Sequence, residues 1–160
     1  FIGLQILKGK IKVNSKISKY FIKKYYEPDL QLKFINSLLK LANTSIDISD
    51  GLIDDLKKMI NRQSVSFHIF EKKIPVSNTL SQLIEIKKLR KIDITSRGDD
   101  YQILFTANPT KSRIIKRISN NTGIKITKIG KIISGKNNSK IINIKNKQIE
   151  AKNKGYIHQF

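Results

Sequence analysis

Residues 45–56, SIDISDGLIDDL, are the most informative segment for the fold, because they lead from an extended segment into a helix through a Ser-Asp-Gly junction. Before the junction, Ile46 and Ile48 alternate with polar residues, as in a short strand. After it, apolar residues recur at helical spacing and form one helix face, made of Leu52, Ile53, Leu56, Met59 and Ile60. The stretch therefore predicts a strand, a turn and a helix in direct succession.

The segments on either side continue the alternation of helices and strands. We expect a helix end at residues 1–8, a connector at 9–15, and helices at 30–39, at 80–89 and after Pro109, the last with Thr110 as its cap. We expect strands at 65–69, 101–106 and 124–133, and a hairpin at 141–150 that turns at Asn146 and Lys147. This order predicts an α+β fold in which helices pack on one mixed or antiparallel sheet.

Length and composition fit one ordinary domain. Of the 160 residues, 39% are apolar, which is enough for a hydrophobic core, and the absence of cysteine excludes disulfides and thiolate metal sites. No segment has the length and apolarity of a membrane span, and no signal-peptide pattern is present. We therefore expect a soluble, cytoplasmic protein with no membrane partner. Because Phe1 lies within an apolar helical stripe, we also expect the chain to be a piece of a longer protein.

The formal net charge of +20, from 32 basic and 12 acidic residues, makes a basic nucleic-acid-binding module the first alternative function. However, lysine far outnumbers arginine, and the lysines are scattered singly along every expected element. Proteins that read phosphates and bases usually present arginine forks and interleaved aromatic residues. We therefore expect no nucleic-acid partner.

The few acidic residues are clustered, and four of them lie within nine residues: Asp47, Asp50, Asp54 and Asp55. One interpretation is helix capping, in which Ser49 or Asp50 accepts free backbone amides and the next two aspartates favour the positive end of the helix dipole. The other is a phosphoryl-transfer site, because carboxylates three residues apart across such a junction can both reach one hard cation while helix-end amides face a phosphate. The residues alone leave both interpretations open.

A second acidic pair, Asp99 and Asp100, lies in the turn 97–100 before the strand 101–106. By itself this pattern is typical of a solvated turn. His68 lies on an alternating strand with no nucleophile triad around it, and the chain has no glycine-rich nucleotide loop of the Walker or dinucleotide kind.

Taken together, four segments in this order resemble the second half of thiamine-monophosphate kinases. They are YYEPDLQLKFINSLLKL (25–41), SIDISDGLIDDL (45–56), GDDYQILFT (98–106) and Gly155-Tyr156 ahead of a terminal His. The likeness covers nearly the whole chain, and IDISDGL followed by GDDYxxLFT at this separation is a specific pair.

The resemblance implies an enzyme that converts thiamine monophosphate to thiamine diphosphate with ATP and Mg²⁺, by direct transfer of the γ-phosphoryl group. It also implies a homodimer. Residues 27–160 would be the C-terminal domain of an aminoimidazole-ribonucleotide-synthetase-like fold, and residues 1–26 the end of the N-terminal domain and a connector. The rest of the N-terminal domain is absent from this sequence. By position, Asp47 and Asp50 resemble Mg²⁺ ligands, Ser49 an ATP contact, and Asp99 and Tyr156 contacts to thiamine monophosphate. Without the N-terminal domain, we expect the chain alone to be inactive.

The chain departs from the family pattern at several positions. Arg97 stands where a first Gly is usual, Gln102 replaces a usual Glu, Ile157 takes the place of an Asp, and Gln159 precedes Phe160. Another ATP-dependent enzyme of the same superfamily and a decayed gene product that folds without activity therefore stay as alternatives beside the nucleic-acid-binding module.

Overall fold

The computed structural model of the chain describes residues 1–61 and 63–152. Its elements follow the order α1 (Ile2–Leu7), α2 (Ser15–Tyr26), η1 (Leu32–Phe34), α3 (Ile35–Leu41), β1 (Thr44–Asp47), α4 (Leu52–Met59), β2 (Val65–Phe70), η2 (Glu71–Lys73), α5 (Asn78–Ile86), α6 (Lys91–Thr95), β3 (Ile103–Thr106), η3 (Pro109–Lys111), α7 (Ser112–Thr122), β4 (Gly130–Ser134), β5 (Lys140–Ile142) and β6 (Gln148–Ile149). The α+β class expected from the sequence is confirmed.

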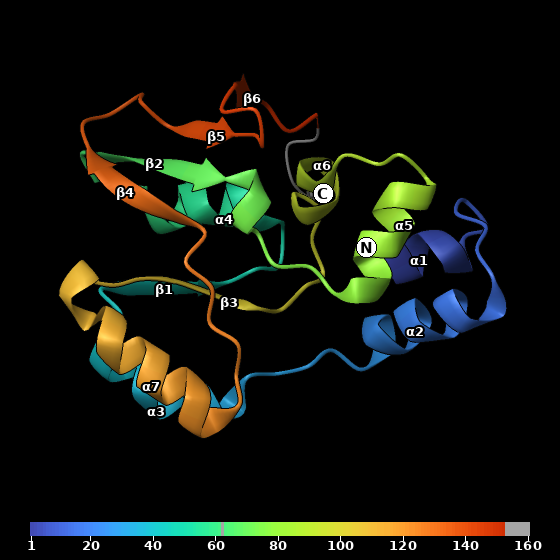
Figure 1. Cartoon of the computed structure of the whole chain (residues 1–160), viewed down its shortest axis with the longest axis horizontal. Coiled ribbons are helices and arrows are strands. Elements are labelled where there is room, and N and C mark those ends of the chain that lie inside the picture. Colours follow the sequence, from blue (N-terminus) through green and yellow to red (C-terminus); the bar gives the residue numbers. More distant parts are fainter. Residues whose placement is uncertain (62, 153–160) are drawn as a thin grey trace, which may run out of the picture.

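The strands of the described residues form two sheets, not the one sheet expected from the sequence (Figure 1). In the smaller sheet β1 pairs antiparallel with β3, so that Ile46 lies opposite Leu104. The larger sheet has the order β4-β2-β5-β6, in which β2 pairs antiparallel with β4 and parallel with β5. The hairpin expected at 141–150 is present as the β5–β6 pair.

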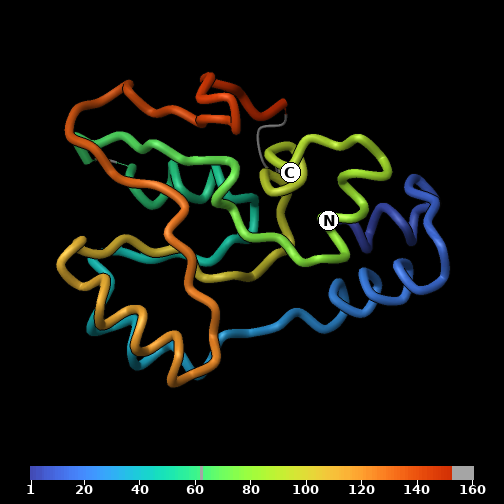
Figure 2. The backbone as a smooth tube through the Cα atoms, viewed as in Figure 1, coloured from blue at the N-terminus to red at the C-terminus, as the bar shows by residue number. Residues whose placement is uncertain are grey.

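Two other expectations differ in detail from the structure. Residues 124–129 run from α7 to β4 without forming a strand, so only the last part of the expected strand 124–133 is paired (Figure 2). The expected cap at Thr110 is wrong, because the Asn108 side chain accepts a hydrogen bond from the Thr110 amide at 3.0 Å and thereby begins η3 ahead of α7. An Asn before a Pro is a favourable place for such a cap.

The main hydrophobic core joins α4 to both sheets. Leu52 and Leu56 of α4 belong to one buried cluster with Phe67 of β2 and Leu104 of β3, and Ile92 of α6 is fully buried there. Because this face of α4 is fixed by packing, the residues just before it are held in place relative to β3.

A second buried cluster joins the two N-terminal helices to α5 through Ile2, Phe21 and Leu83 (Figure 1). Leu83 is only 1% exposed, so these helices pack closely on the rest of the chain. No helix within residues 1–61 and 63–152 has the combination of length and apolarity that crossing a membrane requires.

Candidate functional site

The two acidic segments lie side by side because each continues a strand of the same antiparallel pair. Beyond the end of β1, the Ile48 amide donates to the Gln102 carbonyl at 2.9 Å, and the Tyr101 amide donates back to the Ile48 carbonyl at 2.8 Å. The Asp99 amide then donates to the Ser49 carbonyl at 3.0 Å. Residues 47–51 and 98–101, which are about 50 positions apart in the sequence, therefore form one surface.

Two glycines allow this close approach. Gly51 has φ +127°, and a Cβ there would lie 2.4 Å from the Ser96 carbonyl oxygen. A Cβ on Gly98 would lie 2.0 Å from the Ser49 carbonyl oxygen. Only glycine fits at either position, since such distances are far inside van der Waals contact.

Asp55 holds the junction between β1 and α4. Its side chain is 1% exposed, and its Oδ2 accepts hydrogen bonds from three consecutive backbone amides, those of Ser49 (3.0 Å), Asp50 (2.9 Å) and Gly51 (3.0 Å). The N-cap residue of α4 is Gly51, which has no side chain to cap the helix. The interpretation that Ser49 or Asp50 caps these amides is therefore wrong in its choice of residue, because Asp55 accepts them.

The sequence analysis placed Asp55 at the positive end of the helix dipole but missed its role as acceptor of the junction amides, although a signal was present. Asp55 lies three residues after Leu52 and four before Met59, on the face of α4 that packs into the core. A carboxylate on a buried helix face requires hydrogen-bond donors, because burying an unpaired charge is very costly. That position therefore predicts an acid with a structural partner.

Asp50 is partly buried, with 19% of its side chain exposed, and it forms an ion pair with Lys58. The Lys58 ammonium also contacts Asp55 Oδ1 at 3.1 Å, so one cation joins the two carboxylates. The hydrogen bond to Asp50 is the largest cause that raises the pKa of Lys58. The arrangement shows that positive charge is favoured beside Asp50.

The other aspartates near the junction have different surroundings. Asp47 ends β1 and is exposed, while Asp54 pairs with Lys57 at 3.2 Å on the outer side of α4. Asp99 is exposed and has a positive φ of 68°. Its neighbour Asp100 lies at the surface, but desolvation by the surrounding protein atoms raises the pKa of its carboxyl to about 6; the positive N-terminal amine opposes this rise and the Asp99 charge adds slightly to it. Tyr156 lies outside the described residues.

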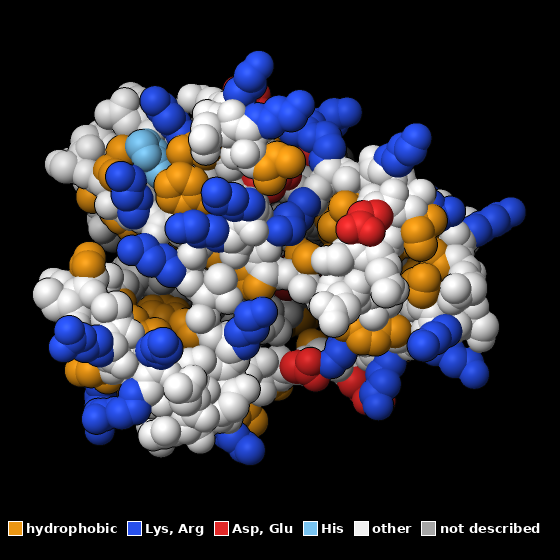
Figure 3. All heavy atoms as spheres, in the orientation of Figure 1, with side chains coloured by type: hydrophobic (Ala, Val, Ile, Leu, Met, Phe, Trp, Pro, Cys, Tyr) orange, Lys and Arg blue, Asp and Glu red, His pale blue; other side chains and the backbone are white. Residues whose placement is uncertain are grey.

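A large hollow borders the second acidic segment. It has a volume of about 1250 Å³ and extends between β3, α7 and residues 124–132, with Asp99, Asp100 and Gln102 on its lining. In the described part of the chain, Asp47, Ser49 and Asp50 do not line it. Figure 3 shows apolar side chains inside the hollowed part of this face, with lysines and arginines spread around it.

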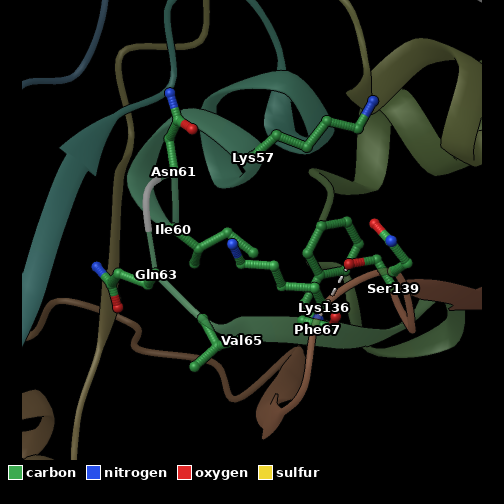
Figure 4. Close-up of a pocket in the computed structure, with 10 residues that line it drawn as sticks. Lys57, Ile60, Asn61, Gln63, Val65, Phe67, Lys136 and Ser139 are labelled. Atoms are coloured by element: carbon green, nitrogen blue, oxygen red, sulfur yellow. Dashed lines mark hydrogen bonds between the residues drawn. The ribbon is translucent and has the colours of Figure 1, made fainter.

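A smaller hollow, of about 590 Å³, lies at the other end of α4, beside the loop that precedes β5 (Figure 4). Two of its polar side chains are already hydrogen-bonded: Ser66 Oγ donates to the Gly135 carbonyl at 2.6 Å, and Ser139 Oγ accepts from the Phe67 amide at 3.3 Å. Lys57 points away from Lys136 in the close-up and pairs with Asp54. Of the predicted site residues that the structure describes, Asp47, Ser49, Asp50 and Asp99, none lines this hollow.

The donor set at the junction fits Mg²⁺ in kind. Asp47 and Asp50 supply hard carboxylate oxygens, and Mg²⁺ is usually held by one or two carboxylates together with substrate phosphates and water. Within the described residues, no group of three or more His, Cys, Asp or Glu side chains is arranged to hold a metal by itself. A metal at this position would therefore need ligands beyond Asp47 and Asp50.

Comparisons of sequence relate the chain to thiamine-monophosphate kinases, although no protein-family model matches it. The chain is 32% identical over 157 residues to the thiamine-monophosphate kinase of Buchnera aphidicola subsp. Schizaphis graminum, a match that covers 98% of this chain and 48% of the relative. It is 30% identical over 131 residues to that of Escherichia coli strain K12, covering 81% of this chain and 40% of the relative. The chain thus spans about half the length of the curated relatives it matches.

Comparisons of structure agree. The crystal structure of thiamine monophosphate kinase from Aquifex aeolicus has a TM-score of 0.72 and 27% identity, and the match covers 92% of this chain and 46% of that one. AaThiL complexed with AMPPCP and TMP has a TM-score of 0.71 and 26% identity, covering 97% of this chain and 47% of that one. The likeness therefore includes the fold as well as the sequence.

Proposed function

Because this chain belongs to the thiamine-monophosphate kinase family, we propose that it supplies one half of an enzyme that phosphorylates thiamine monophosphate to thiamine diphosphate with ATP. The observation that carries the proposal is the pairing of residues 47–51 with residues 98–101, joined by the 3.0 Å hydrogen bond from the Asp99 amide to the Ser49 carbonyl. Two phosphorylated substrates need adjacent binding groups, and this pairing brings two acidic segments onto one surface.

In this proposal Asp47 and Asp50 bind Mg²⁺, Ser49 contacts ATP, and Asp99 and Tyr156 contact thiamine monophosphate. Mg²⁺, when bound, would neutralise charge on the phosphates during transfer. The residues of the chain bind and align the two substrates, since phosphoryl transfer depends mainly on positioning and electrostatic stabilisation. The complex of a similar protein, AaThiL, with AMPPCP and TMP supports this choice of substrates.

We further propose that residues 27–160 are the C-terminal domain of the enzyme, with residues 1–26 the end of a preceding domain and its connector. The preceding domain would supply the remaining metal ligands, so the 160-residue chain alone would be inactive. The proposed enzyme is a cytoplasmic homodimer that has no nucleic-acid partner. On the face drawn in Figure 3 the lysines and arginines are spread across the surface, which supports the last point, because nucleic-acid sites concentrate positive charge in one patch or stripe.

A substrate comparison tests the proposed function. The complete gene product containing these 160 residues is incubated with ATP, Mg²⁺ and either thiamine monophosphate or an acceptor of the related synthetases, such as selenide or formylglycinamidine ribonucleotide. We expect ATP-dependent formation of thiamine diphosphate alone. Robust turnover of another acceptor with none of thiamine monophosphate would refute the proposal. Tight binding to generic DNA that weakens steeply with salt would instead favour the nucleic-acid-binding alternative.

A further inference from the structure

Asp55 is a buried carboxylate, and its burial would be very costly without hydrogen-bond donors or a positive charge beside it. Only 1% of its side chain is exposed, and both of its carboxylate oxygens are engaged, Oδ2 by three backbone amides and Oδ1 by Lys58 at 3.1 Å. We propose that Asp55 is a positioning residue of the kinase site, which fixes the backbone of residues 49–51 so that Asp50 is correctly placed for Mg²⁺. This inference rests on the proposed function for its link to Mg²⁺.

The hydrogen bonds of Asp55 go beyond the capping of a helix. Asp55 is the fourth residue of α4, and two of the three amides it accepts, those of Ser49 and Asp50, precede the N-cap residue Gly51. Asp55 Oδ2 thus accepts three consecutive backbone N–H groups and fixes them in a turn. The hydrogen bonds within α4 would not by themselves produce this turn. Its effect is to set the backbone from which the Ser49 and Asp50 side chains project.

The opposite side of the same turn is held by the second acidic segment. The Ser49 carbonyl accepts the Asp99 amide at 3.0 Å, and Gly98 lies against that carbonyl. Ser49 is therefore held through its amide by Asp55 and through its carbonyl by Asp99. Loss of Asp55 would release the turn on the amide side and let the Asp50 side chain move relative to Asp99, while the hydrogen bond from the Asp99 amide to the Ser49 carbonyl remains.

Lys58 gives Asp55 a second route to Asp50. The ammonium lies between the two carboxylates, so Asp55 helps to hold a positive charge beside Asp50. Asp54 provides a matched control, because it is adjacent in sequence, lies on the same helix and pairs with Lys57 at 3.2 Å on the exposed side. Asp54 accepts none of the amides of residues 49–51 in the described part of the chain.

The test compares Asp55→Asn with Asp54→Asn. The first measurement is amide hydrogen exchange in the 160-residue chain. We expect Asp55→Asn to speed exchange at residues 49–51 more than tenfold while β2 amides change by less than threefold, and Asp54→Asn to leave both unchanged. Equal loss of protection at residues 49–51 and across β2 would mean that Asp55 serves only global stability, which would overturn the proposal.

The second measurement is Mn²⁺ binding to the complete gene product with AMPPCP, followed by electron paramagnetic resonance. We expect Asp55→Asn to weaken Mn²⁺ binding more than tenfold, Asp55→Glu to restore part of it, and Asp54→Asn to match the unaltered protein. Local loss of protection with unchanged Mn²⁺ affinity would overturn the positioning role. If the unaltered protein binds Mn²⁺ as expected but does not phosphorylate thiamine monophosphate, the proposed function fails while the Mn²⁺ comparison still supports the role of Asp55.

Discussion

Replacing Asp50 by Asn tests whether Asp50 is a metal ligand or only stabilises the fold. The change keeps size and shape but removes a hard anionic oxygen of the kind that Mg²⁺ prefers. Asp55, not Asp50, accepts the amides at the start of α4, so Asp50→Asn leaves those hydrogen bonds intact. The fold and the activity should therefore respond very differently.

The cost in stability follows from the ion pair between Asp50 and Lys58. The Lys58 side chain is 51% exposed and that of Asp50 19%, so water and salt screen the pair, and Lys58 keeps its contact with Asp55. Loss of such a pair lowers the free energy of unfolding by about 0.2–1 kcal/mol. Turnover should fall more than about tenfold, which corresponds to about 1.4 kcal/mol of lost transition-state stabilisation.

The assay measures thiamine diphosphate formation at increasing Mg²⁺ concentrations, with urea unfolding of each variant alongside. Part of the lost activity should return at high Mg²⁺ for Asp50→Asn. Asp54→Asn, which also loses one lysine partner, should retain full activity. Equal activities of the two variants would refute Asp50 as a metal ligand, even with the family assignment intact.

Three further predictions test the surroundings of the site and the core. Gly98→Ala should lower kinase turnover more than about tenfold, because its Cβ would lie 2.0 Å from the Ser49 carbonyl oxygen. Gly9→Ala, with nothing within 4 Å of its Cβ but a positive φ of 68°, should cost some stability and leave turnover unchanged. Leu83→Ala should lower the free energy of unfolding, measured in urea, by about 2–5 kcal/mol, because this side chain is 1% exposed and packs against the N-terminal helices. A loss below about 1 kcal/mol would contradict that packing. The pKa of Asp100 is raised in the folded state, so its ionisation should lower the free energy of unfolding as pH rises from the ordinary pKa of 3.8 to about 6. Asp100→Asn should therefore unfold at a higher urea concentration than the unaltered chain at pH 7, and at about the same concentration at pH 3. The opposite order at pH 7 would refute the direction of the shift.

Local patterns predicted the strand–turn–helix unit at residues 45–60 and the hairpin near the C-terminus, because hydrophobic periodicity and turn residues act over short distances. The division into two sheets could not be predicted in that way. Strand partners such as β1 and β3 are far apart in sequence, and alternation along one strand does not specify which other strand it pairs with. The same limit applies to residues 124–129, whose isoleucines suit a strand but which pass between α7 and β4 without forming one.

At the site, the sequence indicated which residues to examine but not how they are connected. The resemblance singled out Asp47, Ser49, Asp50 and Asp99, and the structure brings the two segments that carry them together. The Asp55 carboxylate is buried and accepts hydrogen bonds from three backbone amides. Every residue type except proline has such an amide, so the sequence does not reveal these donors, and the roles of Asp55 and Lys58 could not be predicted from it. Only the place of Asp55 on the apolar face of α4 signalled it.

The most direct test of a Mg²⁺-dependent site at residues 47–51 is the position of a bound metal. Crystals of the complete gene product are grown with AMPPCP and Mn²⁺, and the metal is located by its anomalous scattering. We expect Mn²⁺ in direct coordination with the carboxylate oxygens of Asp47 and Asp50, at the distance of about 2 Å typical of a small hard cation. Bound AMPPCP with Mn²⁺ coordinated by neither aspartate would contradict it.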